Sequence, residues 1–178
     1  MKKLIILFVL FFLSTPMFSQ DESDVSLRNS ELKLNALFLV IGALELEYEY
    51  ILNEESTVGV SVFLPIDEDI DINYYISPYY RWYFGKKRAG GFFVEGFGML
   101  NSVENENYMF DDITFESSST FETKTDFAIG VGLGAKFITK RNFVAEIYGG
   151  IGRNLFNTDG DSDFEIIGKG GIKIGLRL

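Results

Sequence analysis

The chain has 178 residues, with 16 Lys and Arg against 26 Asp and Glu, and it contains neither Cys nor His. This length suits one domain with a single core or barrel. The missing Cys and His exclude disulfides, thiolate and imidazole metal sites and Ser-His-Asp hydrolysis. The net charge of −10 argues against nucleic acid as a partner, because phosphates attract Lys and Arg. The 18 Gly and 18 Phe favour strands over helices, so the composition indicates an all-β protein.

The first residues have the pattern of an export signal. Lys2 and Lys3 precede an apolar run over residues 4–13, which Pro16 ends soon afterwards. This run is too short for a membrane-spanning helix, which needs about 20 apolar residues. We therefore expect residues 1–19 to be a signal peptide and residues 20–30 to form a short N-terminal tail in the periplasm.

Polar and apolar residues alternate from residue 31 onward, and turn-like clusters interrupt the alternation. In the last segment Ile172, Ile174 and Leu176 share one face, while Lys173 and Arg177 share the other. Strands are predicted over residues 31–40, 43–52, 56–65, 73–84, 90–101, 124–138, 142–156 and 164–178. Eight such strands predict an all-β domain over residues 31–178, an eight-stranded antiparallel up-and-down β-barrel.

The two faces of the predicted strands allow two kinds of barrel. A soluble barrel holds its apolar face inside, whereas a transmembrane β-barrel turns that face to lipid and its polar face inward. The interior of eight strands is just wide enough to be filled by side chains. Gly130, Gly132 and Gly134 lie in a row on the polar face, as a crowded interior requires. The pattern therefore favours a transmembrane barrel.

The polar face carries acids and bases in equal numbers. A buried ion without a partner costs several kcal/mol, so a filled interior should be close to neutral. Arg81 is expected to meet Glu45, Glu47 and Glu49. The predicted ion-pair network inside the barrel consists of Lys33, Glu45, Glu47, Glu49, Arg81, Glu95, Lys136, Glu146, Glu165, Lys169, Lys173 and Arg177.

Aromatic residues and loop charges distinguish the two ends of the barrel. Interface aromatics are predicted where even strands end and odd strands begin, namely Tyr50, Trp82, Phe84, Phe92, Phe137 and Phe143. Connections at that end are short, as periplasmic turns are. The opposite connections include a long loop over 101–124, and segments 65–72, 101–126 and 153–163 hold 14 acids against two bases. The acidity of the mature chain is thus expected on one rim.

Alternating aspartates in two rim segments raise the question of a metal site. The better candidate resembles the start of a calcium loop, but Phe164 and Gly170 stand where that loop needs Gly and Glu. We expect solvated loop charges, no metal and no cofactor. The weak candidate consists of Asp159, Asp161 and Asp163, and a similar alternation is formed by Asp67, Asp69 and Asp71.

A resemblance to a known class adds to this interpretation. Residues 76–84, Ile-Ser-Pro-Tyr-Tyr-Arg-Trp-Tyr-Phe, resemble the Pro-x-Tyr-Arg-Tyr-Tyr pattern of an uncharacterised family of small bacterial outer-membrane barrels. The eight alternating strands are similar in plan to OmpA-like and OmpX-like barrels. The resemblance implies a place in the cell outer membrane, contact with outer-membrane lipid and insertion by the barrel assembly machinery. Members serve as structural proteins, adhesins, defence factors or ligand-binding surfaces.

The predicted function is that of a non-enzymatic integral outer-membrane barrel with a charge-paired interior. Its acidic extracellular loops would give it a structural, surface-binding or adhesion role, toward an extracellular ligand that the sequence does not name. Buried carboxylates can in principle transfer protons, but a structural ion-pair network is favoured. The alternative is a secreted soluble β-barrel that binds a small apolar ligand in its interior.

Overall fold

The computed structural model describes residues 28–67, 70–110, 117–156 and 165–178. The predicted signal peptide and all of the tail before residue 28 lie outside the described residues. The elements are β1 (Ser30–Asn35), α2 (Ala36–Val40), β2 (Ala43–Ile51), β3 (Ser56–Pro65), β4 (Ile72–Tyr83), β5 (Gly91–Phe110), β6 (Ser117–Ile138), β7 (Phe143–Asn154) and β8 (Ile166–Arg177).

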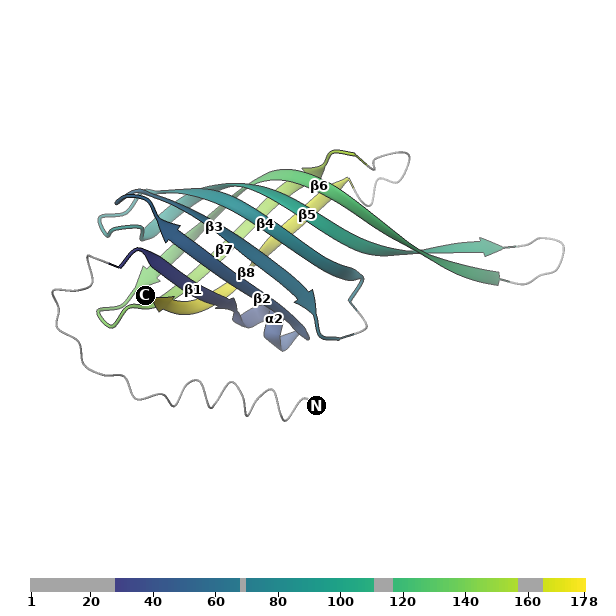
Figure 1. The fold of residues 1–178 in the computed structure, drawn as a ribbon, viewed down its shortest axis with the longest axis horizontal. Coiled ribbons are helices and arrows are strands. Elements are labelled where there is room, and N and C mark those ends of the chain that lie inside the picture. Colours follow the sequence, from purple (N-terminus) through teal and green to yellow (C-terminus); the bar gives the residue numbers. More distant parts are fainter. Residues whose placement is uncertain (1–27, 68–69, 111–116, 157–164) are drawn as a thin grey trace.

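The eight strands form one closed barrel in which each strand pairs with the next along the chain (Figure 1). Every pairing is antiparallel. The barrel closes between β8 and β1, where Leu32 lies opposite Leu176 and Glu31 opposite Arg177. The predicted eight-stranded antiparallel barrel is thereby confirmed. In the described part of the chain, no helix has the length and apolar character needed to cross a bilayer.

One predicted strand is wrong in its second half. Residues 36–40 were expected to continue the first strand, but they form the short helix α2. These five residues are all apolar, so they lack the alternation that a strand with one polar face requires. The helix is capped by Asn35, whose side chain accepts a hydrogen bond from the backbone N–H of Leu37 at 3.2 Å.

The predicted long loop over 101–124 is also wrong, because β5 and β6 continue through most of it. Their pairing runs from Gly91 opposite Lys136 to Phe110 opposite Ser117. Figure 1 shows this two-stranded ribbon projecting past the other strands. The segment 101–124 contains neither Gly nor Pro, the residues that most often interrupt a strand. The pairing of β5 with β6 inside the barrel therefore continues in the same register along the ribbon.

Side chains alternate between a polar interior and an apolar exterior. On β2 the carboxylates of Glu45, Glu47 and Glu49 are buried, while Leu46 and Tyr48 are almost half exposed. Similar alternation on the other strands covers the outer wall with Leu, Ile, Val and aromatic side chains. Apolar surface on this scale is not stable in water, so the exterior suits hydrocarbon.

Apolar clusters close the interior at both ends. At the end that carries α2, the Phe38 ring packs edge-on against Phe63, and Phe63 stacks on Tyr75 with 4.9 Å between centroids. At the end that carries the C-terminus, Tyr83 and Phe93 pack together with Ile51 and with Ala89 of the β4–β5 turn. The charged residues lie between these two clusters.

Candidate functional site

Inside the barrel, acids and bases are packed together without water contact. Twelve of the thirteen buried charged side chains in the described part of the chain belong to this set, with six acids and six bases. We call it the network, and it consists of Glu31, Lys33, Glu45, Glu47, Glu49, Arg81, Glu95, Lys136, Glu146, Lys169, Lys173 and Arg177. Its formal charge is zero, which limits the cost of burying so many ions.

Arg81 on β4 is the most connected member. Its guanidinium lies 3.1 Å from Glu47, 2.6 Å from Glu49, 2.7 Å from Glu95 and 3.0 Å from Glu146. The expected contacts with Glu47 and Glu49 are therefore present, but Glu45 pairs elsewhere. Glu95 is directly opposite Arg81 in the β4–β5 ladder, which explains the Nε hydrogen bond between them.

Lys33 on β1 fills the space between three carboxylates. Its Nζ lies 2.5 Å from Glu47, 2.5 Å from Glu49 and 2.9 Å from Glu146. These three carboxylates come within 4.8 Å of one another, as the ligands of a metal ion would. Lys33 and Arg81 contact all three of these carboxylates, and Lys136 and Lys173 add further pairs with Glu49 and Glu47, so cationic side chains of the protein surround the cluster.

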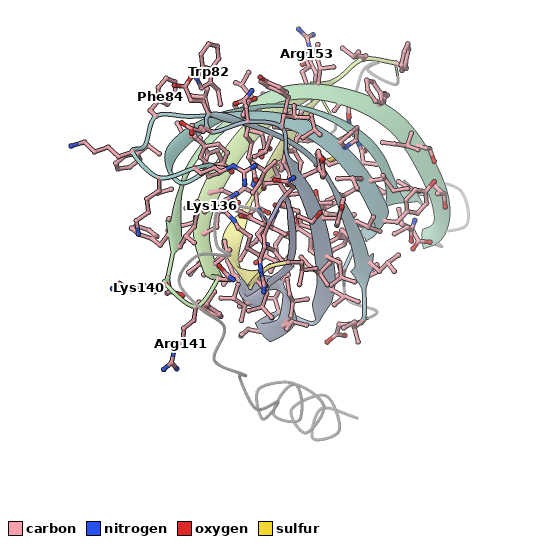
Figure 2. The ribbon with its side chains drawn as sticks, turned by 60° about the vertical axis from the view of Figure 1, so that its left-hand side comes forward. Trp82, Phe84, Lys136, Lys140, Arg141 and Arg153 are labelled. Atoms are coloured by element: carbon pink, nitrogen blue, oxygen red, sulfur yellow. The ribbon has the colours of Figure 1, made fainter. Side chains whose placement is uncertain are left out.

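Toward the C-terminus, Arg177 of β8 connects the network to the β4–β5 turn. Its guanidinium lies 2.6 Å from Glu31 and donates to the carbonyls of Arg88 and Ala89 at 3.1 and 3.2 Å. Lys136 also contacts Glu31, at 2.9 Å, and it pairs with Glu49; Figure 2 shows it inside the barrel. The β4–β5 turn is thus held over this mouth of the barrel.

Toward α2, the network passes from ion pairs to neutral polar groups. Lys173 lies 3.0 Å from Glu45, which also accepts hydrogen bonds from the Asn35 amide at 2.6 Å and the Tyr148 hydroxyl at 3.0 Å. Lys169 lies 2.8 Å from Glu95. Each of the six buried carboxylates in the network therefore contacts at least one Lys or Arg.

One predicted member of the network is wrong. Glu165 lies before β8 begins, outside the interior, and pairs with Arg153, whose side chain is 67% exposed. Glu31, expected at the start of the first strand among the periplasmic charges, takes its place among the acids. The sequence signal for Glu31 was its spacing of two residues from Lys33, which puts both side chains on one face of β1.

The glycine row on the polar face accommodates aromatic rings from the opposite strand. A Cβ on Gly134 would come within 2.5 Å of the Phe93 ring, and a Cβ on Gly130 would collide with the Phe97 ring. Phe93 lies opposite Gly134 and Phe97 opposite Gly130 in the β5–β6 ladder. These rings flank the network, with Arg81 4.5 Å from the centre of Phe93.

The predicted interface aromatics lie on the outer wall, at the end of the barrel that carries the C-terminus. The exposed fraction of Trp82 is 52%, that of Phe84 66% and that of Phe92 73%. The first two rings stack with their centres 6.4 Å apart and appear together at the outer surface in Figure 2. The remaining predicted members, also exposed, are Tyr50, Phe137 and Phe143.

The aspartates considered for a metal lie apart from the network. Asp159, Asp161 and Asp163 fall outside the described residues, as does Asp69. Asp67 and Asp71 lie in the β3–β4 connection, at the end of the barrel that carries α2. Nothing in the described residues joins them to the buried carboxylates.

Comparisons with known proteins agree with this architecture. No protein-family model and no curated protein sequence matches the chain. The N-terminal β-barrel domain of OprF from Pseudomonas aeruginosa matches in structure with a TM-score of 0.52 and 18% identity, over 84% of this chain and 97% of that domain. The chain therefore shares the β-barrel fold of that domain, and its own barrel is closed by eight antiparallel strands, as predicted.

Proposed function

We propose that the protein is an integral barrel of the bacterial outer membrane. One observation carries this proposal: an exposed apolar wall surrounds a buried, charge-neutral ion network. Water would favour the reverse arrangement, whereas a bilayer favours apolar side chains on the outside and tolerates charges only within. The OprF-like fold supports the same location.

The two ends of the barrel suggest its orientation. The turns β2–β3, β4–β5 and β6–β7, at the end that carries the C-terminus, are short, as periplasmic turns are. At the other end the β5–β6 ribbon projects beyond the wall, and the connections there are rich in Asp and Glu. We place that acidic end at the cell surface, where it would serve a structural, surface-binding or adhesion role.

The barrel is proposed to be non-enzymatic. Every carboxylate of the network is committed to Lys or Arg, so none is poised to accept a proton from a substrate. The apolar clusters at both ends also separate the network from outside molecules. The alternative of a soluble barrel that holds an apolar ligand finds no support, because ions fill the middle of the interior.

Fractionation of cells and gel mobility together test the proposal. The protein should appear in the outer-membrane fraction, require detergent for extraction, and migrate differently on a denaturing gel before and after boiling. Recovery in the soluble fraction without detergent would overturn the membrane assignment. A control barrel of known location and a known soluble protein, processed in the same preparation, calibrate the fractions.

A further inference from the structure

A groove crosses the outer wall over β5, β6 and β7. It is an open depression of about 660 Å³ on the outer surface of the sheet. Its outward-facing lining consists of Val94, Gly96, Val131, Leu133, Gly149 and Ile151. The lining is almost wholly apolar, so the groove suits a hydrocarbon chain.

Two glycines create the groove. Gly96 of β5 and Gly149 of β7 face outward, and a Cβ on either one would meet no atom within 4 Å. In the sheet, Leu133 lies between Val94 and Gly149, and Val131 lies between Gly96 and Ile151. Each of these two neighbouring rows across the sheet therefore has one glycine beside two larger side chains. The two glycine positions together form one depression in the wall.

The two turns below the groove are basic, whereas the neighbouring β2–β3 turn carries Glu54 and Glu55. The β4–β5 and β6–β7 turns adjoin, because Lys87 Nζ donates to the Ile138 carbonyl at 3.1 Å. Lys140 and Arg141 are exposed in the second turn, and Figure 2 shows them pointing away from the barrel. The two turns carry five basic residues, Lys86, Lys87, Arg88, Lys140 and Arg141, and no acid.

Groove and basic turns are spaced like the tail and headgroup of a lipid. Along β6, Leu133 precedes Phe137 by four residues, or about 13 Å of strand. With a strand tilt of about 40°, that is about 10 Å along the barrel axis. Phe137 and Phe92 are exposed between the groove and the turns, where aromatic side chains mark the level of lipid headgroups.

We propose that this wall binds an anionic phospholipid, with an acyl chain in the groove and the phosphate at Lys87, Lys140 and Arg141. The site rests on the proposed function, since it needs the barrel to span a bilayer with its basic turns at the periplasmic leaflet. Charge complementarity selects an anionic headgroup over a zwitterionic one. The groove also gives an acyl chain a defined apolar binding position, which non-specific electrostatic attraction between a basic surface and anionic lipids would not provide.

The chain provides its own probe for this site. Trp82 is the one tryptophan in the sequence, faces outward and lies opposite Val94 of the groove. The protein would be reconstituted in phosphatidylcholine vesicles that contain either brominated phosphatidylglycerol or brominated phosphatidylcholine at equal mole fraction. Bromine on the acyl chains quenches tryptophan fluorescence on contact. We expect stronger quenching by the brominated phosphatidylglycerol.

Two variants test the two parts of the site. Each Lys or Arg near a membrane strengthens anionic lipid binding by about fivefold, so K140Q/R141Q should lower the preference for phosphatidylglycerol by at least about fivefold. Gly149→Leu should fill the groove, and it should abolish most of the preference without disturbing the fold because its Cβ points into open space. Arg153→Gln, exposed at the opposite end, is the matched charge control.

The outcomes separate the two proposals. Quenching by both brominated lipids to the same extent would overturn the lipid site and leave the membrane barrel in place. Absence of quenching by either lipid would overturn the membrane barrel itself. A preference that survives both K140Q/R141Q and Gly149→Leu would also overturn the site. Quenching that falls for both lipids as protein concentration rises would indicate a second copy in the groove and likewise overturn it.

Discussion

Arg81 touches four of the six carboxylates in the network, and its side chain has no contact with solvent. Replacing it by Ala would leave these acids short of one positive charge in a dry interior. Breaking a buried ion pair in this way costs about 3–5 kcal/mol. We expect Arg81→Ala to lower the free energy of unfolding by that amount, measured by urea titration in detergent.

The exposed pair Arg153–Glu165 provides the control for Arg81. Exposed ion pairs contribute about 0–1 kcal/mol because water and salt screen them. Arg153→Ala should therefore leave the urea midpoint nearly unchanged. If Arg81→Ala also left the urea midpoint unchanged, the ion pairs of Arg81 would not stabilise the interior of the barrel.

Gly134 tests the close packing of rings against the glycine row. A Cβ there would approach the Phe93 ring and the Ile147 carbonyl at 2.5 and 2.6 Å. We expect Gly134→Ala to destabilise the barrel by about 1–3 kcal/mol, as overpacked interiors do. Thermal unfolding followed by circular dichroism measures this loss. Gly149→Ala is the matched control on the outer wall, and equal losses in the two variants would contradict the assignment of faces.

Single residues show how far the sequence could predict the site. Residues two positions apart on a strand share one face of the sheet, so the sequence pattern identified eleven residues of the network as facing inward. Glu165 was misplaced because the alternation of polar and apolar residues does not show where a strand begins. The predicted strand started at residue 164, whereas β8 starts at Ile166, just after Glu165. Which acid meets which base depends on register and barrel shear, and these cannot be read from one strand alone.

Two elements differ from the sequence prediction. Residues 36–40 were predicted as strand and form helix α2, whereas residues 101–124 were predicted as loop and mostly form the β5–β6 ribbon. The apolar run 36–40 looked like strand, but at the rim its backbone closes into a helical turn capped by Asn35. Residues 101–124 were predicted as a long loop, but β5 and β6 go on pairing with each other as far as Phe110 opposite Ser117. Pairing between two strands needs only their backbones, so the hydrophobic pattern of the barrel wall does not show where it ends.

The projecting part of the ribbon is expected to be dispensable for folding. The β4–β5 ladder ends at Ile72 opposite Val103, and the β6–β7 ladder ends at Ala128. Backbone contacts with the neighbouring segments extend slightly further, since the Glu104 N–H donates to the Asp71 carbonyl and the Leu155 N–H to the Phe127 carbonyl. In the described residues of 105–122, β5 and β6 pair only with each other. Replacing residues 105–122 by Asn-Gly would join Glu104 to Thr123, which are opposite each other, through a two-residue turn.

We expect this shortened chain to keep the gel shift on boiling and the urea midpoint of the full chain. A second variant that removes 101–126 would cut into the ladder with β4, where Asn101, Ser102 and Val103 pair, and serves as the disruptive control. Loss of the gel shift in the 105–122 replacement would mean that the ribbon stabilises the wall from which it projects.

For the whole molecule, the enclosed position of the network predicts a weak dependence of stability on salt. Ions in solution screen exposed charges but act little on buried pairs, and apolar clusters close both ends of this interior. The urea midpoint in a nonionic detergent should change little between low salt and 1 M NaCl. A large fall would show that salt reaches the interior, and single-channel recordings should then detect conductance.

The charges of the network are sorted along the chain. The first two strands contribute Glu31, Glu45, Glu47 and Glu49 against Lys33, whereas the last strand contributes Lys169, Lys173 and Arg177. On the inner face of a sheet that has not yet closed, β1 and β2 together therefore carry a net charge of −3, and β8 at the other edge carries +3. Attraction between them would draw β8 toward β1 before their backbone hydrogen bonds form, and only the joined edges, with Glu31 beside Arg177, are neutral. The amino-acid order thus favours a closed ring over an open sheet during assembly.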